Sequence, residues 1–468
     1  MGFLHGVETI VKNVGGVPIT AVRSAVLGIV GIAPKGATNT PTLISSPQQA
    51  VDTFGKELAG FSIPQALRAL FDQGKGIAIV VNVYDEATHA VAVTAETQTV
   101  ANGKAKTSFE PVGSTFTVTN NGGTTTYVAG TDYTRDEFGN ILVLNGAIAN
   151  GASIKITYKK LDVSTVTAAH IIGTAGSSPT GIAAFDAALT LFGFDAKIFI
   201  APTHLSLSGV PEALLVAATK FKGVTIYSAP NGTNYTTALA GRGSSGTVPG
   251  FKAGSNRVIL AWPNWKVVNN GTGVTETRPA DQYLAGVIAA TDANFGYWYS
   301  PSNKQVLGVV EPETAVQWSI NDETCQANIL NGAGVVTIIN AFGGGFRFWG
   351  NRNASFPAAS GPETFISVVR TTGVIDTSIE FAMLQYLDEP LDQAIIDAIR
   401  NTVNGFLNAL KGRRAILGGQ CQFLPEKNPA LELAAGHLVF DVDYMAPPST
   451  ERITFDRALN IEYLKTLA

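Results

Sequence analysis

Short apolar runs alternate with amphipathic segments along much of this chain, and this order limits the fold more than any other feature. The run AVLGIVGIA begins at Ala25 and is closed by Pro34, and IAIVVNVY at 77–84 forms a second run. Between them, segments 47–54 and 63–71 carry apolar residues at helical spacing. Strands that alternate with helices predict a parallel or mixed sheet with helices on both faces.

The same alternation resumes near residue 168. The sequence predicts helices at 181–192, 210–221, 279–291 and 321–330, and strands at 197–201, 223–227, 257–262 and 335–340. We therefore predict an α/β core with a mixed sheet, formed by residues 25–87 and 166–345. A chain of 468 residues easily buries a core of this size.

Residues 88–165 interrupt this core with a different composition. They are rich in Thr, Val, Gly and Asn, and short alternating runs such as STFTVTN and SIKITYKKL are separated by turn signals such as Asn120-Asn121-Gly122. Because both ends return to the α/β pattern, we predict an inserted all-β domain that resembles a small sandwich.

The segment 346–447 predicts a C-terminal α+β domain. A β-like stretch at 364–369 is followed by helices at 375–387 and 391–410, and HLVFDVDYMAP at 437–447 alternates as a strand. A cationic cluster ends the second helix, where the helix dipole favours positive charge. This cluster consists of Lys411, Arg413 and Arg414.

The two ends of the chain cannot form a core of their own. Residues 1–24 have β propensity but are broken by Gly and Pro, and residues 448–468 form a charged, extended segment. We interpret them as an N-terminal and a C-terminal arm, although a frayed terminus fits the N-terminal segment as well. Only 15% of the residues are charged, which favours a surface covered by further copies of the chain.

Charge and motif content exclude several functions. The 32 Lys and Arg residues against 36 Asp and Glu exclude electrostatic binding of nucleic acid as the main role. The longest apolar stretch, 25–34, is about half of a membrane span, so we predict neither membrane insertion nor a signal peptide. The two cysteines, Cys325 and Cys421, predict reduced, buried thiols in a protein made in the cytoplasm.

No catalytic pattern occurs in the sequence. GxSxG, HExxH and GxxxxGK[ST] are all missing, and the five histidines are scattered singly. Asp441 and Asp443 lie on one face of the predicted strand, where they fit a Ca²⁺ or acid site, but a solvated strand face is the simpler interpretation. We predict no catalytic residue, no metal and no cofactor, and hence no enzyme.

Five segments resemble the contractile tail sheath proteins of bacteriophages. They are HGVETIVKNVGGVPITAVRSAVLGIVGIAPKG near the N-terminus, RPADQYLAGVIAATDANFGYWYSPSN at 278–303, GFRFWGNRNAS at 345–355, the long run at 371–419, and the closing AGHLVFDVDYMAPPSTERITFDRALNIEYL. The resemblance runs in order along almost the whole chain. It implies a subtilisin-like sheath core in fold, without proteolysis.

The resemblance also implies a mechanism. Sheath subunits form stacked hexameric rings around a tail tube and contract to drive the tube through the host envelope. The implied partners are the chain itself, the tail tube protein, and baseplate and tail terminator proteins. The implied location is the virion tail, after assembly in the host cytoplasm.

In this family the arms of two subunits complete a small sheet in a third, and a β-prone arm gains its hydrogen bonds at such an edge. We predict an N-terminal donated strand with Val7, Thr9, Val11 and Val14, and a C-terminal one with Ile453, Phe455, Leu459 and Ile461. The predicted accepting strand carries Leu438, Phe440, Val442 and Tyr444, joined by segment 364–369. We further predict that Lys411, Arg413 and Arg414 contact the tube, although a helix end that attracts cations explains them equally well.

Two alternatives stay open at this point. The chain also fits the sheath of a phage-tail-like bacteriocin or contractile injection particle, because the difference lies in what the tube carries. An α/β hydrolase or a carbohydrate-binding protein with a surface β module is the alternative from another class, and it predicts a monomer with dispensable termini.

Overall fold

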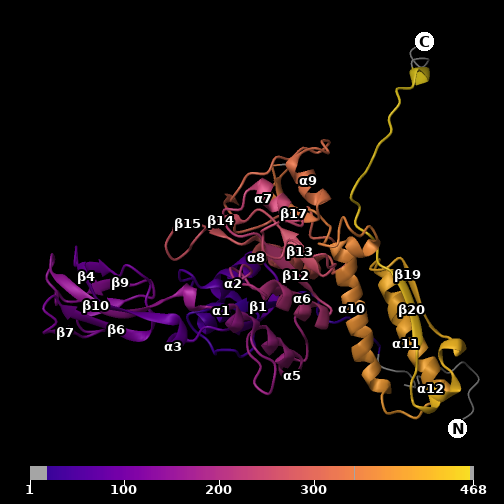
Figure 1. The fold of residues 1–468 in the computed structure, drawn as a ribbon, viewed down its shortest axis with the longest axis horizontal. Helices are drawn as coiled ribbons and strands as arrows, with labels where there is room; N and C mark the ends of the chain where they lie inside the picture. Colours follow the sequence, from indigo (N-terminus) through magenta and orange to yellow (C-terminus); the bar gives the residue numbers. More distant parts are fainter. Residues whose placement is uncertain (1–17, 342, 464–468) are drawn as a thin grey trace, which may run out of the picture.

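A sheet of eight strands forms the centre of the computed structural model, which describes residues 18–341 and 343–463 (Figure 1). The order is β18-β17-β13-β12-β11-β1-β3-β2. All neighbours pair in parallel except β2 and β18, which are antiparallel at the two edges. The strands are β1 (Val26–Gly31), β2 (Thr42–Ile44), β3 (Ile77–Asn82), β11 (Ile198–Ile200), β12 (Val224–Ser228), β13 (Val258–Ala261), β17 (Val335–Asn340) and β18 (Phe346–Trp349).

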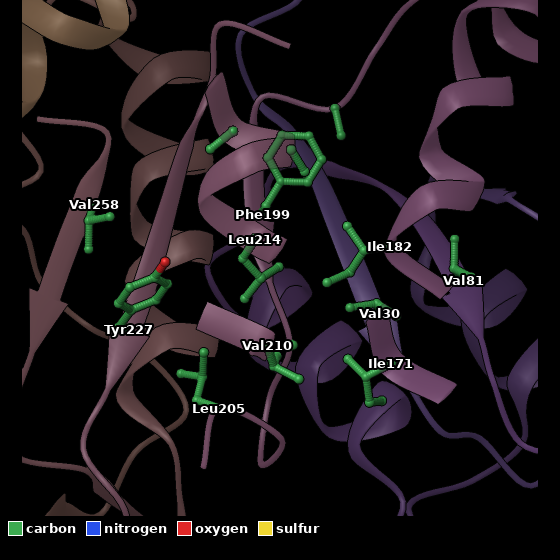
Figure 2. Close-up of a cluster of buried hydrophobic side chains, with 14 of the residues drawn as sticks. Val30, Val81, Ile171, Ile182, Phe199, Leu205, Val210, Leu214, Tyr227 and Val258 are labelled. Atoms are coloured by element: carbon green, nitrogen blue, oxygen red, sulfur yellow. The ribbon is translucent and has the colours of Figure 1, made fainter. Parts of the chain in front are cut away.

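Helices cover both faces of this sheet, as the alternating pattern predicts. Strand side chains alternate between two buried clusters, so Val30 of β1 packs on one face and Ile29 on the other. Val30, Val81, Ile171 and Leu214 all belong to the cluster on the first face, where Val30 lies between Val81 and Leu214 (Figure 2). The helices of this face include α4 (Ala168–Ile172), α5 (Ala188–Phe192) and α6 (Val210–Lys220), and those of the other include α1 (Pro47–Phe54), α2 (Ser62–Asp72) and α8 (Ala280–Asn294).

Most predicted elements of the core are confirmed within a few residues. The helix expected at 321–330 is the main exception, because α9 spans only Gln326–Gly332. The Asp322 carboxylate accepts hydrogen bonds from the amide and the hydroxyl of Thr324, which holds the preceding residues in a turn. The first half of the helix expected at 181–192 is a 3-10 helix, Gly181–Ala187, that continues into α5.

Two further sheets lie in the segment 90–161, which extends away from the main sheet (Figure 1). One consists of β4 (Ala90–Thr99), β10 (Ser153–Leu161), β6 (Val112–Asn120) and β7 (Thr126–Tyr127), and the other of β5 (Lys104–Lys106), β9 (Asn140–Val143) and β8 (Tyr133–Arg135). They share a buried cluster of their own, which includes Ile156 and Tyr158. The short helix α3 (Glu86–His89) leads into β4.

A smaller sheet and a short helix complete the core region. The sheet consists of β15 (Thr275–Arg278), β14 (Trp265–Val268) and β16 (Glu311–Pro312), and the helix is α7 (Tyr235–Ala240). Strand β18 extends the main sheet beyond residue 345, because Phe348 is buried in the same cluster as β1 and β3. None of the described helices has the length and hydropathy that a membrane crossing requires.

The β segment predicted at 364–369 is wrong, because helix α10 begins there and spans Ile366–Met383. Its residues are buried on two sides: Ile366 and Val369 pack into the main core, and Val374 packs against the C-terminal helices. Thr371 donates its hydroxyl proton to the carbonyl four residues before it, as helical threonines do. Burial therefore outweighs the β propensity of this run.

The C-terminal region pairs a long helix with a two-stranded sheet. Helix α11 (Gln393–Gly412) begins at the N-cap Asp392 and packs its apolar stripe against β19 (Gly418–Phe423) and β20 (Phe440–Met445), which are antiparallel. The sequence predicts β20 as longer, at 437–447, and it gives no sign of β19. A short helix, α12 (Ala430–Ala434), lies between the two strands in the chain.

Candidate assembly interface

The two-stranded sheet has one edge that is closed by a side chain. In the register of this sheet Cys421 of β19 lies opposite Val442 of β20. The Asn404 carboxamide of α11 accepts a hydrogen bond from the Cys421 amide at 2.7 Å and donates one to the Cys421 carbonyl at 2.9 Å. The amide and carbonyl of one strand residue point to the same side, so at Cys421 both point away from β20.

The opposite edge, along β20, is open. Because opposed residues share their orientation, the backbone groups of Phe440, Val442 and Tyr444 point away from β19. No strand within 18–341 or 343–463 pairs with them. Their side chains pack, partly buried, against the cluster under α11. The structure thus brings three of the four predicted acceptor residues together on one unpaired edge.

The fourth predicted acceptor residue, Leu438, precedes the strand. Here a second carboxamide replaces strand pairing: Asn428 accepts from the Val439 amide and donates to the carbonyls of Val439 and Leu424, all at 2.8 to 2.9 Å. Asn428 is 5% exposed, so these bonds are shielded from water. The regular β19–β20 ladder consequently ends at the Phe423–Phe440 pair.

The acidic residues of β20 have partners of their own. Asp441 pairs with Lys427 at 2.6 Å, and Asp443 accepts from the side chain of Gln420 at 2.9 Å. Within the described residues no group of three metal-ligating side chains lies here or elsewhere. Tyr444 donates to Asp376 at 3.1 Å, and burial raises the pKa of the Tyr444 phenol. These contacts fix the face of the sheet and leave its backbone edge free.

The C-terminal arm leaves the body of the molecule as an extended chain (Figure 1). Its predicted strand residues Ile453, Phe455, Leu459 and Ile461 are 70%, 88%, 88% and 73% exposed. Soluble monomers seldom expose so many large apolar side chains in one segment. Residues 448–460 are extended and form no regular strand pairing, and 461–463 form one turn of 3-10 helix.

The described part of the N-terminal arm lies along α10. Ile19 and Val22 pack against the cluster beneath α11, and the Val22 amide donates to the Ser378 hydroxyl at 3.0 Å. The Ser24 carbonyl accepts from Arg370, a residue of α10 whose guanidinium also pairs with the buried Asp292 of α8. The predicted strand residues Val7, Thr9, Val11 and Val14 lie outside the described residues.

The predicted cationic cluster is exposed at the C-terminal end of α11. Lys411, Arg413 and Arg414 all face solvent, and no salt bridge within the described ranges involves them. Three unneutralised cations on a helix end attract an acidic surface through a field that salt screens.

Two histidines that lie far apart in the sequence are in contact in the fold. His89 Nε2 lies 3.2 Å from His170 Nδ1, and His89 Nδ1 accepts from the amide of Asp85. Burial, reinforced by His170, lowers the pKa of His89. The two residues are 81 positions apart in the chain, so a search of the sequence for short spacings does not find this contact.

Two family profiles match this chain. The profile described as the phage tail sheath protein central domain matches residues 165–354, and the one described as the phage tail sheath C-terminal domain matches 363–460. The second range includes the two-stranded sheet, the cationic cluster and most of the C-terminal arm.

Curated relatives extend the similarity to the whole chain. The tail sheath protein of Burkholderia phage BcepMu is 40% identical over 99% of this chain and 98% of its own length. The tail sheath protein of Escherichia phage P2 is 25% identical over 99% of this chain and 97% of its own length.

Solved structures share the fold at low identity. The contracted PVC sheath of an extracellular contractile injection system has a TM-score of 0.60 at 14% identity, covering 99% of both chains. The contracted helical sheath of the anti-feeding prophage has a TM-score of 0.61 at 17% identity, covering 98% of this chain and all of its own. On the strength of the full-length relative and the two profiles, this chain belongs to the family of phage tail sheath proteins.

Proposed function

We propose that this chain is the structural subunit of a contractile tail sheath, which polymerises around a tail tube and shortens to drive the tube through the host envelope. Membership of the sheath family supports a structural role and argues against the hydrolase and carbohydrate-binding alternatives. We keep the subtilisin-like core, and the divisions 1–24, 25–87 with 166–345, 88–165, 346–447 and 448–468, as parts of this proposal.

The observation that carries the proposal is an open strand edge in a molecule whose C-terminal arm forms no strand pairing over residues 448–460. The outer edge of β20 offers backbone groups at Phe440, Val442 and Tyr444, and the C-terminal arm exposes Phe455 and Leu459. A donated strand forms about half a dozen backbone hydrogen bonds, each contributing roughly 1 kcal/mol net. Strand addition therefore satisfies the edge and buries the arm in one step.

Exchange between copies generates a lattice. An arm of one copy bound to the edge of another is a head-to-tail contact, which continues as rings or helices instead of closing as a dimer. We propose stacked hexameric rings in which a C-terminal arm and an N-terminal arm, with Val7 to Val14 as its strand, complete the β19–β20 sheet of a third copy. The arms then keep subunits linked while the globular bodies move between two packings.

The partners and the location follow from the same role. We propose that Lys411, Arg413 and Arg414 hold an acidic tube surface until contraction, and that baseplate and tail terminator proteins bind the two ends of the sheath. The assembled protein belongs to the virion tail and forms in the host cytoplasm. No nucleic acid, cofactor or membrane insertion enters this mechanism.

A second setting is the sheath of a bacteriocin or injection particle. The solved sheaths with this fold include one described as part of an extracellular contractile injection system and one from the anti-feeding prophage. Particles purified from a producing strain separate the two settings: packaged DNA supports the phage tail, and tailed particles that contain no DNA support the injection particle.

Negative-stain electron microscopy tests the proposal. We expect sheath-like tubes from the full-length protein and soluble monomers from a chain that lacks residues 1–20, whose N-terminal arm is too short to be donated. A full-length protein that stays monomeric at high concentration would overturn the proposal. So would tubes that form equally well from the shortened chain.

A further inference from the structure

At the closed edge of β19, the Asn404 side chain forms the hydrogen bonds that a neighbouring strand would form. A carboxamide carries a carbonyl acceptor beside N–H donors, as a peptide group carries an acceptor and a donor, and Asn404 uses its oxygen and one N–H on the backbone of Cys421. The orientation is supported at Gly419, where an added Cβ would lie 2.8 Å from the Cβ of Tyr444. In antiparallel strands the side chains of opposite residues lie this close only where the two residues do not exchange backbone hydrogen bonds, so Gly419 and Tyr444 form such a pair. Cys421 lies two residues further along β19, so Cys421 and Val442 form the same kind of pair.

Asn404 is held firmly in this position. Its neighbours on α11, Val403, Phe406 and Leu407, are each at most 6% exposed and pack in the cluster that contains Cys421. The side chain is therefore presented to the edge by a helix that cannot turn away without opening that cluster. No comparable side chain within the described residues bonds the backbone of Val442, the residue opposite Cys421.

We propose that Asn404 closes the β19 edge, so that strands donated by other copies add only along the outer edge of β20. This inference rests on the proposed exchange of arms. It has a consequence for assembly: if two arms complete one sheet, both lie on the β20 side, the first against β20 and the second against the first. The second arm has no site until the first has bound, so assembly is ordered.

Closing one edge also prevents wrong products. A two-stranded sheet with both edges open accepts a strand on either side, which allows lattices with different neighbours. Asn428 adds a second restriction, because its bonds to Leu424 and Val439 end the ladder at a fixed position. Together the two carboxamides leave a single acceptor edge of defined length.

Amide hydrogen exchange on the full-length monomer tests the closure itself. In Asn404→Ala the Cys421 amide should exchange at least about tenfold faster, since losing a bond of about 1.4 kcal/mol is a tenfold change. Asn404→Asp should keep the Cys421 amide slow, because a carboxylate still accepts that bond, although it cannot donate to the carbonyl. The matched control is Asn408→Ala, one turn along α11 and exposed, which should leave the rate unchanged.

Exchange on the assembled protein tests the direction of strand addition. In the wild type, amides of Phe440, Val442 and Tyr444 should become protected on assembly, while those of Gly419 and Phe423 on the β19 edge should not. In Asn404→Ala, Gly419 and Phe423 should also gain protection, and irregular aggregates should replace uniform tubes; Asn408→Ala should assemble as the wild type.

The outcomes separate this inference from the proposed function. Protection of Gly419 and Phe423 in the wild-type assembly, or an unchanged Cys421 rate in Asn404→Ala, overturns the role of Asn404 while exchange of arms still stands. A wild type that never assembles overturns the exchange of arms and, with it, any limit on strand addition. If Asn404→Ala does not fold, Asn404→Asp provides the test. Its carboxylate cannot donate to the Cys421 carbonyl, so the β19 edge is only partly closed. Assembly of Asn404→Asp should therefore be less ordered than assembly of the wild type, and assembly as ordered as the wild type would overturn the role of Asn404.

Discussion

The guanidinium of Arg352 holds the carboxylate of Glu451 at 2.6 Å, where the C-terminal arm leaves the body of the molecule. The same guanidinium lies 3.7 Å from the ring centre of Phe365 and 4.8 Å from that of Phe356, and it donates to the Thr364 hydroxyl. An arginine fixed by two rings and a hydroxyl presents a rigid fork to a carboxylate. This contact anchors the base of the arm and sets the direction in which it departs.

Glu451→Gln should release the base of the arm without unfolding the protein. The loss of a partly exposed ion pair costs about 1 kcal/mol or less in global stability. Limited proteolysis of the monomer should cut the variant faster within 449–463, and tube formation should require a higher protein concentration.

The neighbouring pair Arg452–Glu323 provides the control for this prediction. Its side chains are 75% and 77% exposed, so Glu323→Gln should change neither proteolysis nor assembly. Equal proteolysis of Glu451→Gln and the wild type would show that Arg352 does not anchor the arm.

Phe455→Asp should weaken assembly and leave the monomer unchanged. The side chain is 88% exposed in the monomer, and burying a phenylalanine contributes about 1.5 to 3 kcal/mol. The critical concentration for tubes, measured by sedimentation, should therefore rise by about 10- to 100-fold. The adjacent Asp456→Asn serves as the control and should change it little. A variant that assembles at the wild-type concentration would place Phe455 outside the interface.

Neutralising the cationic cluster should weaken contact with the tube. In the triple variant Lys411→Gln, Arg413→Gln and Arg414→Gln, co-sedimentation with purified tubes should fall at low salt, and raising the salt should weaken the wild type to a similar level. Lys104→Gln with Lys106→Gln, far away in β5, should bind as the wild type. Unchanged binding by the triple variant at low salt would contradict the proposed contact.

The buried Asp281 should make stability depend on pH. Burial raises its pKa from 3.8 to about 7, so the folded chain holds this proton more tightly than the unfolded chain does. The protonated carboxyl stabilises the fold fully at pH values below the pKa of the unfolded chain. This contribution is lost as the pH rises from the pKa of the unfolded chain through that of the folded chain, by about 1.4 kcal/mol per pH unit between the two pKa values.

Asp281→Asn isolates this contribution, because the amide stays neutral at every pH. Chemical unfolding between pH 4 and 8 should show the stability of the wild type falling relative to the variant as the pH rises. Parallel pH profiles for the two proteins would mean that Asp281 titrates normally.

The order of the core elements could be predicted because strands and helices differ in the local spacing of their apolar residues. Buried runs such as 77–81 are continuously apolar, as is typical of strands covered on both faces. The boundaries of α10 could not be predicted in this way. Its first turn, Ile366 to Val369, has β-branched residues, and only its position between two packed cores makes it helical.

The assembly edge was predictable in part. Alternation in HLVFDVDY identifies β20 and the phase of Phe440, Val442 and Tyr444. Strand β19 begins with two glycines, which carry no pattern, and the bond of Asn404 to Cys421 joins a helix to a strand 17 positions later. The contact of His89 with His170 could not be predicted for the same reason, because the fold brings the two residues together and their spacing in the sequence follows no motif.

The central claim is strand addition along the outer edge of β20, and Val442→Pro tests it most directly. Proline removes the amide proton that points away from β19, so it blocks the acceptor edge and spares the internal ladder. Val442→Ala is the matched control, since it loses similar packing and keeps the amide. Negative-stain electron microscopy should show tubes from Val442→Ala and folded monomers from Val442→Pro. Tubes of normal form and yield from Val442→Pro would contradict the account.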